Sequence, residues 1–256
     1  MHMEQCHYWL PKSKGRAMAL LATKHHYFTV RHFVISPNSS GSAGRLFLQV
    51  AEFPLRSLKH LEIRSLSLPE SYGNLINLQH LDMSHSSNLE RLPDSFGSLI
   101  NLQHIDLSCT KLERLLNSFR NLINLQHLDQ LSHHVHNSCH FTSGISLRWL
   151  SDYLWNLTRL KYLGLSGCYN ITLSNETLGN MSTLENLHLS DFSGMEALPF
   201  QLAHQRSLEI LSLSEMYSLI ELPSDIGELR NLKKLELSHC TNLKCLRDSL
   251  QRLKLE

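Results

Sequence analysis

The feature that most constrains this chain is a short leucine pattern that recurs along most of its length. The string Leu-x-x-Leu-x-Leu, with Ile or Met at some positions, occurs eight times, its first leucine falling at residues 58, 78, 102, 125, 160, 184, 208 and 232. Successive copies are separated by 20, 24, 23, 35, 24, 24 and 24 residues. A period of this length is typical of a solenoid, in which each repeat stacks on its neighbours and cannot bury its apolar face alone.

Other apolar columns keep the same register. The positions three, six and ten residues before each first leucine are apolar in almost every copy, as Leu99, Phe96 and Leu92 illustrate, and Gln205 is a departure. Of the 53 leucines in the chain, 50 lie between residues 46 and 256. Most of them fall in these columns, so leucine supplies one continuous core along the repeats.

Each copy also predicts its own local structure. The Leu-x-Leu alternation indicates a short strand with one buried face. The Leu-Pro-x-Ser-x-Gly segment indicates a turn before a short helical stretch, with the glycine at 73, 97, 179 or 227 easing the turn. Stacked copies predict an α/β leucine-rich-repeat solenoid, a curved horseshoe arc with a parallel β-sheet on its concave face and 3₁₀, short helical or irregular segments on its convex face.

Charge divides the chain into two regions. Residues 1–45 hold six Lys or Arg against one Glu, and we expect a basic, weakly ordered N-terminal segment or cap there. Residues 46–256, with 18 basic and 22 acidic residues, form the predicted domain of about eight repeats. The copy at Leu125 is off-register and is followed by an insertion near residues 132–146. Leu246, Leu250 and Leu253 begin a ninth copy that stops at Glu256, so we expect a truncated array.

Two segments carry a resemblance to a known family. Residues 92–109 read Leu-Pro-Asp-Ser-Phe-Gly-Ser-Leu-Ile-Asn-Leu-Gln-His-Ile-Asp-Leu-Ser-Cys, and residues 222–240 are similar. This array resembles the leucine-rich-repeat region of plant intracellular nucleotide-binding disease-resistance proteins. The resemblance implies a cytoplasmic protein that recognises an effector, or regulates a signalling partner, in plant innate immunity. The chain contains no Gly-x-x-x-x-Gly-Lys-Ser/Thr phosphate loop, so we expect it to bind no nucleotide.

Two alternatives stay open beside that interpretation. The first is a general cytosolic signalling scaffold built on the same repeats. The second is a fragment of an extracellular leucine-rich-repeat receptor, for which five Asn-x-Ser/Thr sequons speak, at Asn38, Asn156, Asn170, Asn175 and Asn180. Against it, the Gly-x-Ile-Pro typical of extracellular plant receptors is absent.

Several function classes are disfavoured. No stretch approaches the ~20 apolar residues that span a bilayer, so we expect no membrane insertion. Ser, His and Asp recur as regular copies, which is a poor sign of one preorganised catalytic site, and we expect neither an enzyme nor a cofactor. The repeats are net acidic, which argues against nucleic-acid binding.

The insertion holds a group of residues able to bind metal ions. They are His133, His134, His136, Cys139 and His140, and they could hold zinc. We favour a polar loop, because no paired ligand motif of recognised spacing is present. Cys168 and Cys240 share one repeat slot three copies apart, which places them ~14 Å apart, beyond the ~7 Å limit for a disulfide.

Recognition is expected on the concave face, where the side chains between the leucines project in columns. We predict that a protein partner contacts His60, Glu62, His80, Asp82, His104, Asp106, His127, Asp129, Tyr162, Asn186, His188, Lys234 and Glu236. We expect this face to be acidic at neutral pH and to lose negative potential as its histidines protonate near pH ~6.5. Simple duplication of Asn-Leu-Gln-His-Leu-Asp is an alternative origin of the columns.

Overall fold

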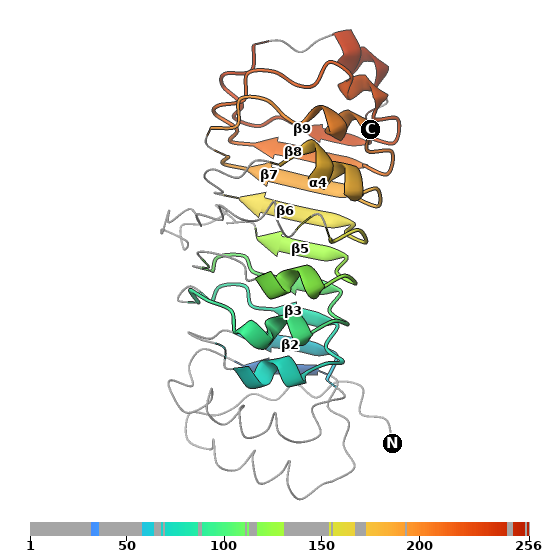
Figure 1. The fold of residues 1–256 in the computed structure, drawn as a ribbon. Coiled ribbons are helices and arrows are strands. Elements are labelled where there is room, and N and C mark those ends of the chain that lie inside the picture. The colour runs from blue at the N-terminus through green and yellow to red at the C-terminus, as the bar shows by residue number, and fades with distance from the viewer. Residues whose placement is uncertain are drawn as a thin grey trace, which may run out of the picture.

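The strands of the computed structural model form one open sheet, in which every pairing is parallel and neighbours in the sheet are neighbours in the chain. Residues 32–35, 58–63, 68, 70–86, 89–110, 112, 117–130, 154, 156–166, 173–192, 194–244, 248–253 and 255 are described. The strands are β1 (His32–Ile35), β2 (His60–Ile63), β3 (His80–Asp82), β4 (His104–Asp106), β5 (His127–Gln130), β6 (Tyr162–Ser166), β7 (Asn186–Ser190), β8 (Ile210–Ser214) and β9 (Lys234–Glu236). Figure 1 shows them stacked in chain order along the molecule.

Strand β1 extends the sheet beyond the eight predicted strands. It pairs in register with β2, so that His32 lies beside His60 and Ile35 beside Ile63. The sequence around it, Val30-Arg31-His32-Phe33-Val34-Ile35, has the repeat spacing with Val, Phe and Ile in place of leucine. A strand of the sheet therefore lies within residues 1–45, the segment that the charge distribution sets apart.

Short helices connect the strands and cover one face of the sheet (Figure 1). They are η2 (Glu70–Asn74), η3 (Asp94–Ser98), η4 (Asn117–Asn121), α4 (Asn175–Asn180), η5 (Phe200–His204), η6 (Ile226–Glu228) and η7 (Asp248–Arg252). All but α4 are 3₁₀ helices, which suit segments of one to two turns. The predicted sheet with short helices opposite it is confirmed.

The core lies between the sheet and these helices. The first leucines of the repeats, such as Leu78, Leu102 and Leu125, are fully buried, and Phe96 and Phe119 of the helices stack at 6.0 Å between ring centroids. Strands β2, β3, β4 and β7 alternate buried and partly exposed residues, so one sheet face is packed and the other is open. We call the second the open face; it is the predicted binding face.

Side-chain amides and hydroxyls tie several repeats to the one before. Asn101 donates from Nδ2 to the carbonyl oxygen of Ile76 at 2.8 Å, and Asn124 makes the same bond to Ile100. In later repeats Thr183, Ser207, Asn231 and Asn242 donate to Thr158, Ser182, Arg206 and Tyr217. These bonds satisfy carbonyl groups that a loop would otherwise leave to water, and they fix the stacking distance.

Two glycines allow the helices to approach closely. A Cβ placed on Gly97 would lie 2.5 Å from both the Cβ and the carbonyl oxygen of Ser118, and one on Gly73 would lie 2.5 Å from the Cβ of Ser95. Both glycines lie inside 3₁₀ helices. The predicted reason for these glycines, a turn before the helix, is therefore wrong, because what requires them is contact with the next repeat.

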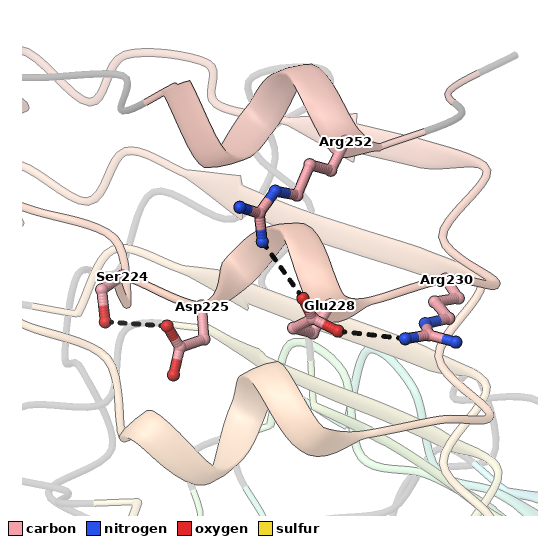
Figure 2. Close-up of polar contacts among 5 residues, drawn as sticks. All are labelled: Ser224, Asp225, Glu228, Arg230 and Arg252. Carbon is pink, nitrogen blue, oxygen red and sulfur yellow. Dashed lines mark hydrogen bonds and ion pairs between the residues drawn. The ribbon is translucent and has the colours of Figure 1, made fainter.

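Ion pairs on the helix side join η6 and η7. Figure 2 shows Glu228 between Arg252 and Arg230, with N···O distances of 3.3 and 3.4 Å, and Ser224 beside Asp225. Arg230 and Arg252 are exposed, and exposed pairs of this kind contribute only about 0–1 kcal/mol. Packing of Leu250 and Leu253 against the core attaches η7 more firmly.

Candidate functional site

The predicted binding residues that the sequence places in two columns lie on the open face. His60 and Glu62 come from β2, His80 and Asp82 from β3, His104 and Asp106 from β4, His127 and Asp129 from β5, Tyr162 from β6, Asn186 and His188 from β7, and Lys234 and Glu236 from β9. The strand register aligns them one repeat to the next, His80 with His104 and Asp82 with Asp106. Cross-strand neighbours on one sheet face are in direct contact range.

Five aromatic rings of the first column form a continuous stack, which we call the ring ladder: His60, His80, His104, His127 and Tyr162. Its successive centroids lie 4.2, 4.3, 5.5 and 4.0 Å apart, with interplanar angles of 15°, 11°, 30° and 5°. His188, from the second column, tilts against Tyr162 at 5.1 Å. The ring faces are therefore turned toward one another and the ring edges toward solvent.

Burial in the stack keeps His80, His104 and His127 neutral at physiological pH. Desolvation, together with the neighbouring charges of His104, His60 and His127, lowers the pKa of His80 to about 4. Desolvation also lowers the pKa of His104 and of His127. The prediction of protonation near pH ~6.5 is therefore wrong for these three histidines, because removing water from an imidazole disfavours its charged form.

The acidic residues of the second column, Glu62, Asp82, Asp106 and Asp129, form what we call the acidic ladder. Asp82 and Asp106 each accept a hydrogen bond at Oδ1 from the backbone N–H two residues on, at 2.8 Å. Among the residues that the structure describes, no Lys or Arg pairs with Glu62, Asp82 or Asp106.

Asp129 differs from the other members of the acidic ladder. Its exposed fraction is 8 %, and its Oδ2 accepts from the hydroxyl of Tyr162 at 3.3 Å. Burial and the Asp129 charge raise the pKa of Tyr162. The sequence placed Asp129 and Tyr162 in neighbouring columns of adjacent repeats, and a Tyr one strand from an Asp was the available signal for this bond.

The later repeats carry a different charge pattern. Lys161 pairs with Glu185 at 3.0 Å, Lys233 with Glu209 at 2.8 Å, and Lys234 with Glu236 at 2.7 Å. The hydrogen bonds from Lys234 and Ser212 lower the pKa of Glu236. Lys161, Lys233 and Lys234 thus neutralise acidic neighbours in this half, whereas Glu62, Asp82 and Asp106 pair with no Lys or Arg of the described residues.

The weak zinc candidates His133, His134, His136, Cys139 and His140 lie outside the described residues. Within the part of the chain that the structure describes, no group of three His, Cys, Asp or Glu could hold a metal ion. Cys240 is a thiol that donates to the carbonyl oxygen of Leu213 at 3.1 Å, a structural role in the slot that the sequence singled out. Cys168, its counterpart three copies earlier, is not among the described residues.

No helix in the described ranges has the length and hydropathy to cross a membrane.

Comparisons with known proteins identify the fold of this chain. No protein-family model matches the chain, and no curated protein matches it. Among solved structures, a leucine-rich-repeat protein of Leptospira interrogans is 24% identical with a TM-score of 0.63, covering 89% of this chain and 60% of its own. The leucine-rich-repeat domain of the type III effector XopL is 21% identical with a TM-score of 0.65, covering 94% and 87%.

A plant receptor is also among the similar structures. The peptide hormone receptor RGFR1, solved in complex with RGF2, is 21% identical with a TM-score of 0.50, covering 81% of this chain and 34% of its own. At these identities the likeness concerns the fold alone, and the chain spans 60% of the length of the Leptospira protein. Leucine columns, in-register parallel strands and these structural neighbours together show that the chain is a leucine-rich-repeat solenoid.

Proposed function

We propose that this chain is a non-catalytic protein-interaction module of the cytoplasm that recognises an effector, or regulates a signalling partner, in plant innate immunity. The observation that carries the proposal is the open face of β2 to β5: the leucines of these strands are buried in the core, and an aligned set of rings and carboxylates lies on the other side. Such a surface suits recognition of another protein, because many weak contacts can be made along several strands at once.

The immune role rests on the resemblance of residues 92–109 and 222–240 to plant disease-resistance repeats. The fold supports interaction in general, since leucine-rich-repeat proteins present extended surfaces to partners. That RGFR1 was solved with a bound partner adds support of the same general kind.

The test compares two double variants in plant cells, with and without pathogen challenge. His80→Ala with His104→Ala removes two rings from the ring ladder. Phe200→Ala with His204→Ala removes an exposed ring pair, 6.4 Å between centroids, from the helix side. We expect proximity labelling to lose specific partners only in the first variant, with at least one partner dependent on challenge.

Two outcomes would contradict the proposal. An identical set of labelled proteins for wild type and both variants would remove the open face from recognition. A set that depends on the ring ladder yet never changes with challenge would remove the immune role and leave a general signalling scaffold.

A further inference from the structure

The acidic ladder and the ring ladder together make one half of the open face rich in hydrogen-bond acceptors. Glu62, Asp82 and Asp106 present carboxylate oxygens without a cationic partner among the described residues. Beside them, the neutral rings of His80, His104 and His127 each have one acceptor nitrogen. Among the described residues that directly precede the ladder strands, Lys59 and Lys161 are the cations, and three Gln lie between them. Lys161 is paired with Glu185.

Charge complementarity therefore selects a donor-rich, cationic occupant for this half of the face. The later repeats offer no such selection, because Lys161, Lys233 and Lys234 already neutralise their acidic neighbours. Arg suits the carboxylates best, since its guanidinium donates several N–H groups in a fixed plane and stays charged.

The spacing of the carboxylates restricts the conformation of the occupant. Adjacent strands are ~4.8 Å apart, so Glu62 and Asp106, two strands apart, repeat at ~9.6 Å. A polyproline II chain turns once in three residues and advances ~9.3 Å, which returns every third side chain to the same face at nearly this distance. An extended β-chain returns every second side chain at ~6.8 Å, which matches neither one strand step nor two.

We infer that the half of the open face formed by the ring ladder and by Glu62, Asp82 and Asp106 binds a basic segment of a partner protein, laid across the strands in polyproline II conformation with Arg or Lys at every third residue. This inference rests on the proposed function and names the chemistry of the partner. The first cation contacts Glu62, the next contacts Asp106, and Asp82 lies between them within reach of either.

The first experiment uses two capped peptides of the same composition on the full chain. One is Gly-Arg-Pro-Pro-Arg-Pro-Pro-Arg-Gly, with Arg at every third position, and the other is Gly-Arg-Arg-Arg-Pro-Pro-Pro-Pro-Gly, with the Arg residues clustered. We expect calorimetry at low salt to show about fivefold tighter binding of the spaced peptide, a difference of about one surface ion pair. Equal affinities, or tighter binding of the clustered peptide, would overturn the inference.

The second experiment localises the peptide. The triple variant Glu62→Gln, Asp82→Asn, Asp106→Asn removes three charges and keeps the oxygen that accepts from the backbone at both Asp positions. Its control, Glu90→Gln, Asp94→Asn, Glu196→Gln, removes the same charge from exposed residues outside the two ladders. We expect at least a tenfold loss of affinity for the spaced peptide in the first triple variant and less than a twofold loss in the control. Equal losses in both would overturn the inference, because binding would then follow net charge only.

The experiments distinguish failure of the inferred partner chemistry from failure of the proposed function. If the spaced peptide shows no preference while ring-ladder variants still lose labelled partners in cells, the partner chemistry is wrong and the interaction module stands. If ring-ladder variants lose no partner, the proposed function itself is wrong, whatever the peptides do. The peptide comparison uses unmodified protein, so it holds even if a triple variant folds poorly.

Discussion

Gln205 is a polar residue in an otherwise apolar column, and it offers a test at the scale of a single side chain. It is 4 % exposed; its Nε2 donates to the carbonyl oxygen of Leu178 at 2.6 Å, while its Oε1 has no partner among the described residues. The Leu178 carbonyl also accepts from the backbone N–H of Met181 at 3.0 Å. Replacing Gln205 therefore orphans no group and removes one buried unsatisfied oxygen.

We expect Gln205→Leu to raise the free energy of unfolding by about 1 kcal/mol, because leucine buries apolar area where glutamine buries an unpaired oxygen. Urea denaturation monitored by circular dichroism measures the change. Gln251→Leu, the same exchange at an exposed position of η7, serves as the control and should stay within about 0.5 kcal/mol of wild type. A Gln205→Leu protein less stable than wild type would show that the Leu178 bond outweighs the orphaned oxygen.

At this scale the sequence predicted columns but not conformations. It placed His80, His104 and their neighbours correctly in one column, because the alternation within each strand and the constant repeat length allow only one register between neighbouring strands. It could not predict that His85, Cys109, Asp191, Glu215 and His239 take a left-handed backbone, since none is a glycine. That conformation follows from how the chain leaves each strand, which becomes visible only once repeats stack.

The contact between helices of neighbouring repeats can be tested at two glycines that occupy equivalent repeat positions. A Cβ on Gly97 would lie 2.5 Å from backbone and side-chain atoms of Ser118, whereas one on Gly179 of α4 would meet nothing closer than Gln201 Cγ at 3.7 Å. We expect Gly97→Ala to lower the free energy of unfolding by about 1–3 kcal/mol through overpacking. We expect Gly179→Ala to raise it by up to about 1 kcal/mol, because alanine favours the helix.

Thermal and urea unfolding of both variants measure this difference in sign. If Gly97→Ala were as stable as Gly179→Ala, the spacing between η3 and η4 would not be fixed by the glycine. The repeat template alone gives both glycines the same place and so predicts the same effect for both. The distinction lies in the neighbouring helix, where Ser118 lies against one glycine and a flexible Gln201 against the other.

Over the whole molecule, the fold was largely predictable and its first strand was not. Eight strands, their order and their register follow from the leucine period, because each repeat can bury its leucines only against the next. Strand β1 was not predicted, because Val30, Phe33 and Ile35 occupy the positions where leucine is expected. The spacing to the next copy is also longer than in most of the repeats. The protonation of histidines on the open face was also predicted wrongly, because repeat spacing indicates which rings are in contact but not how far they are desolvated.

That loss of water makes the stability of the solenoid depend on pH. The pKa of His80 is lowered to about 4, and those of His104, His127 and His188 are lowered as well, in each case chiefly by desolvation. In the unfolded chain these imidazoles titrate near pH ~6.5, so below that pH the unfolded state binds more protons and folding becomes less favourable. The stabilising contribution is therefore fully present well above pH ~6.5, begins to be lost as the pH approaches that value and declines further toward pH ~4.

The groups around His80 determine how this decline is measured. His60, His104 and His127 oppose its protonation, while Glu62, Asp82 and Asp106 face it from the acidic ladder. Glu70 and Glu236 have a lowered pKa, so their contributions are lost only at lower pH. We expect the Tm to fall steadily from pH 7 to pH 5, and His80→Gln to reduce that slope. His204→Gln, on the helix side, should keep the wild-type slope, and a His80→Gln slope equal to it would show that the ring ladder does not control the pH response.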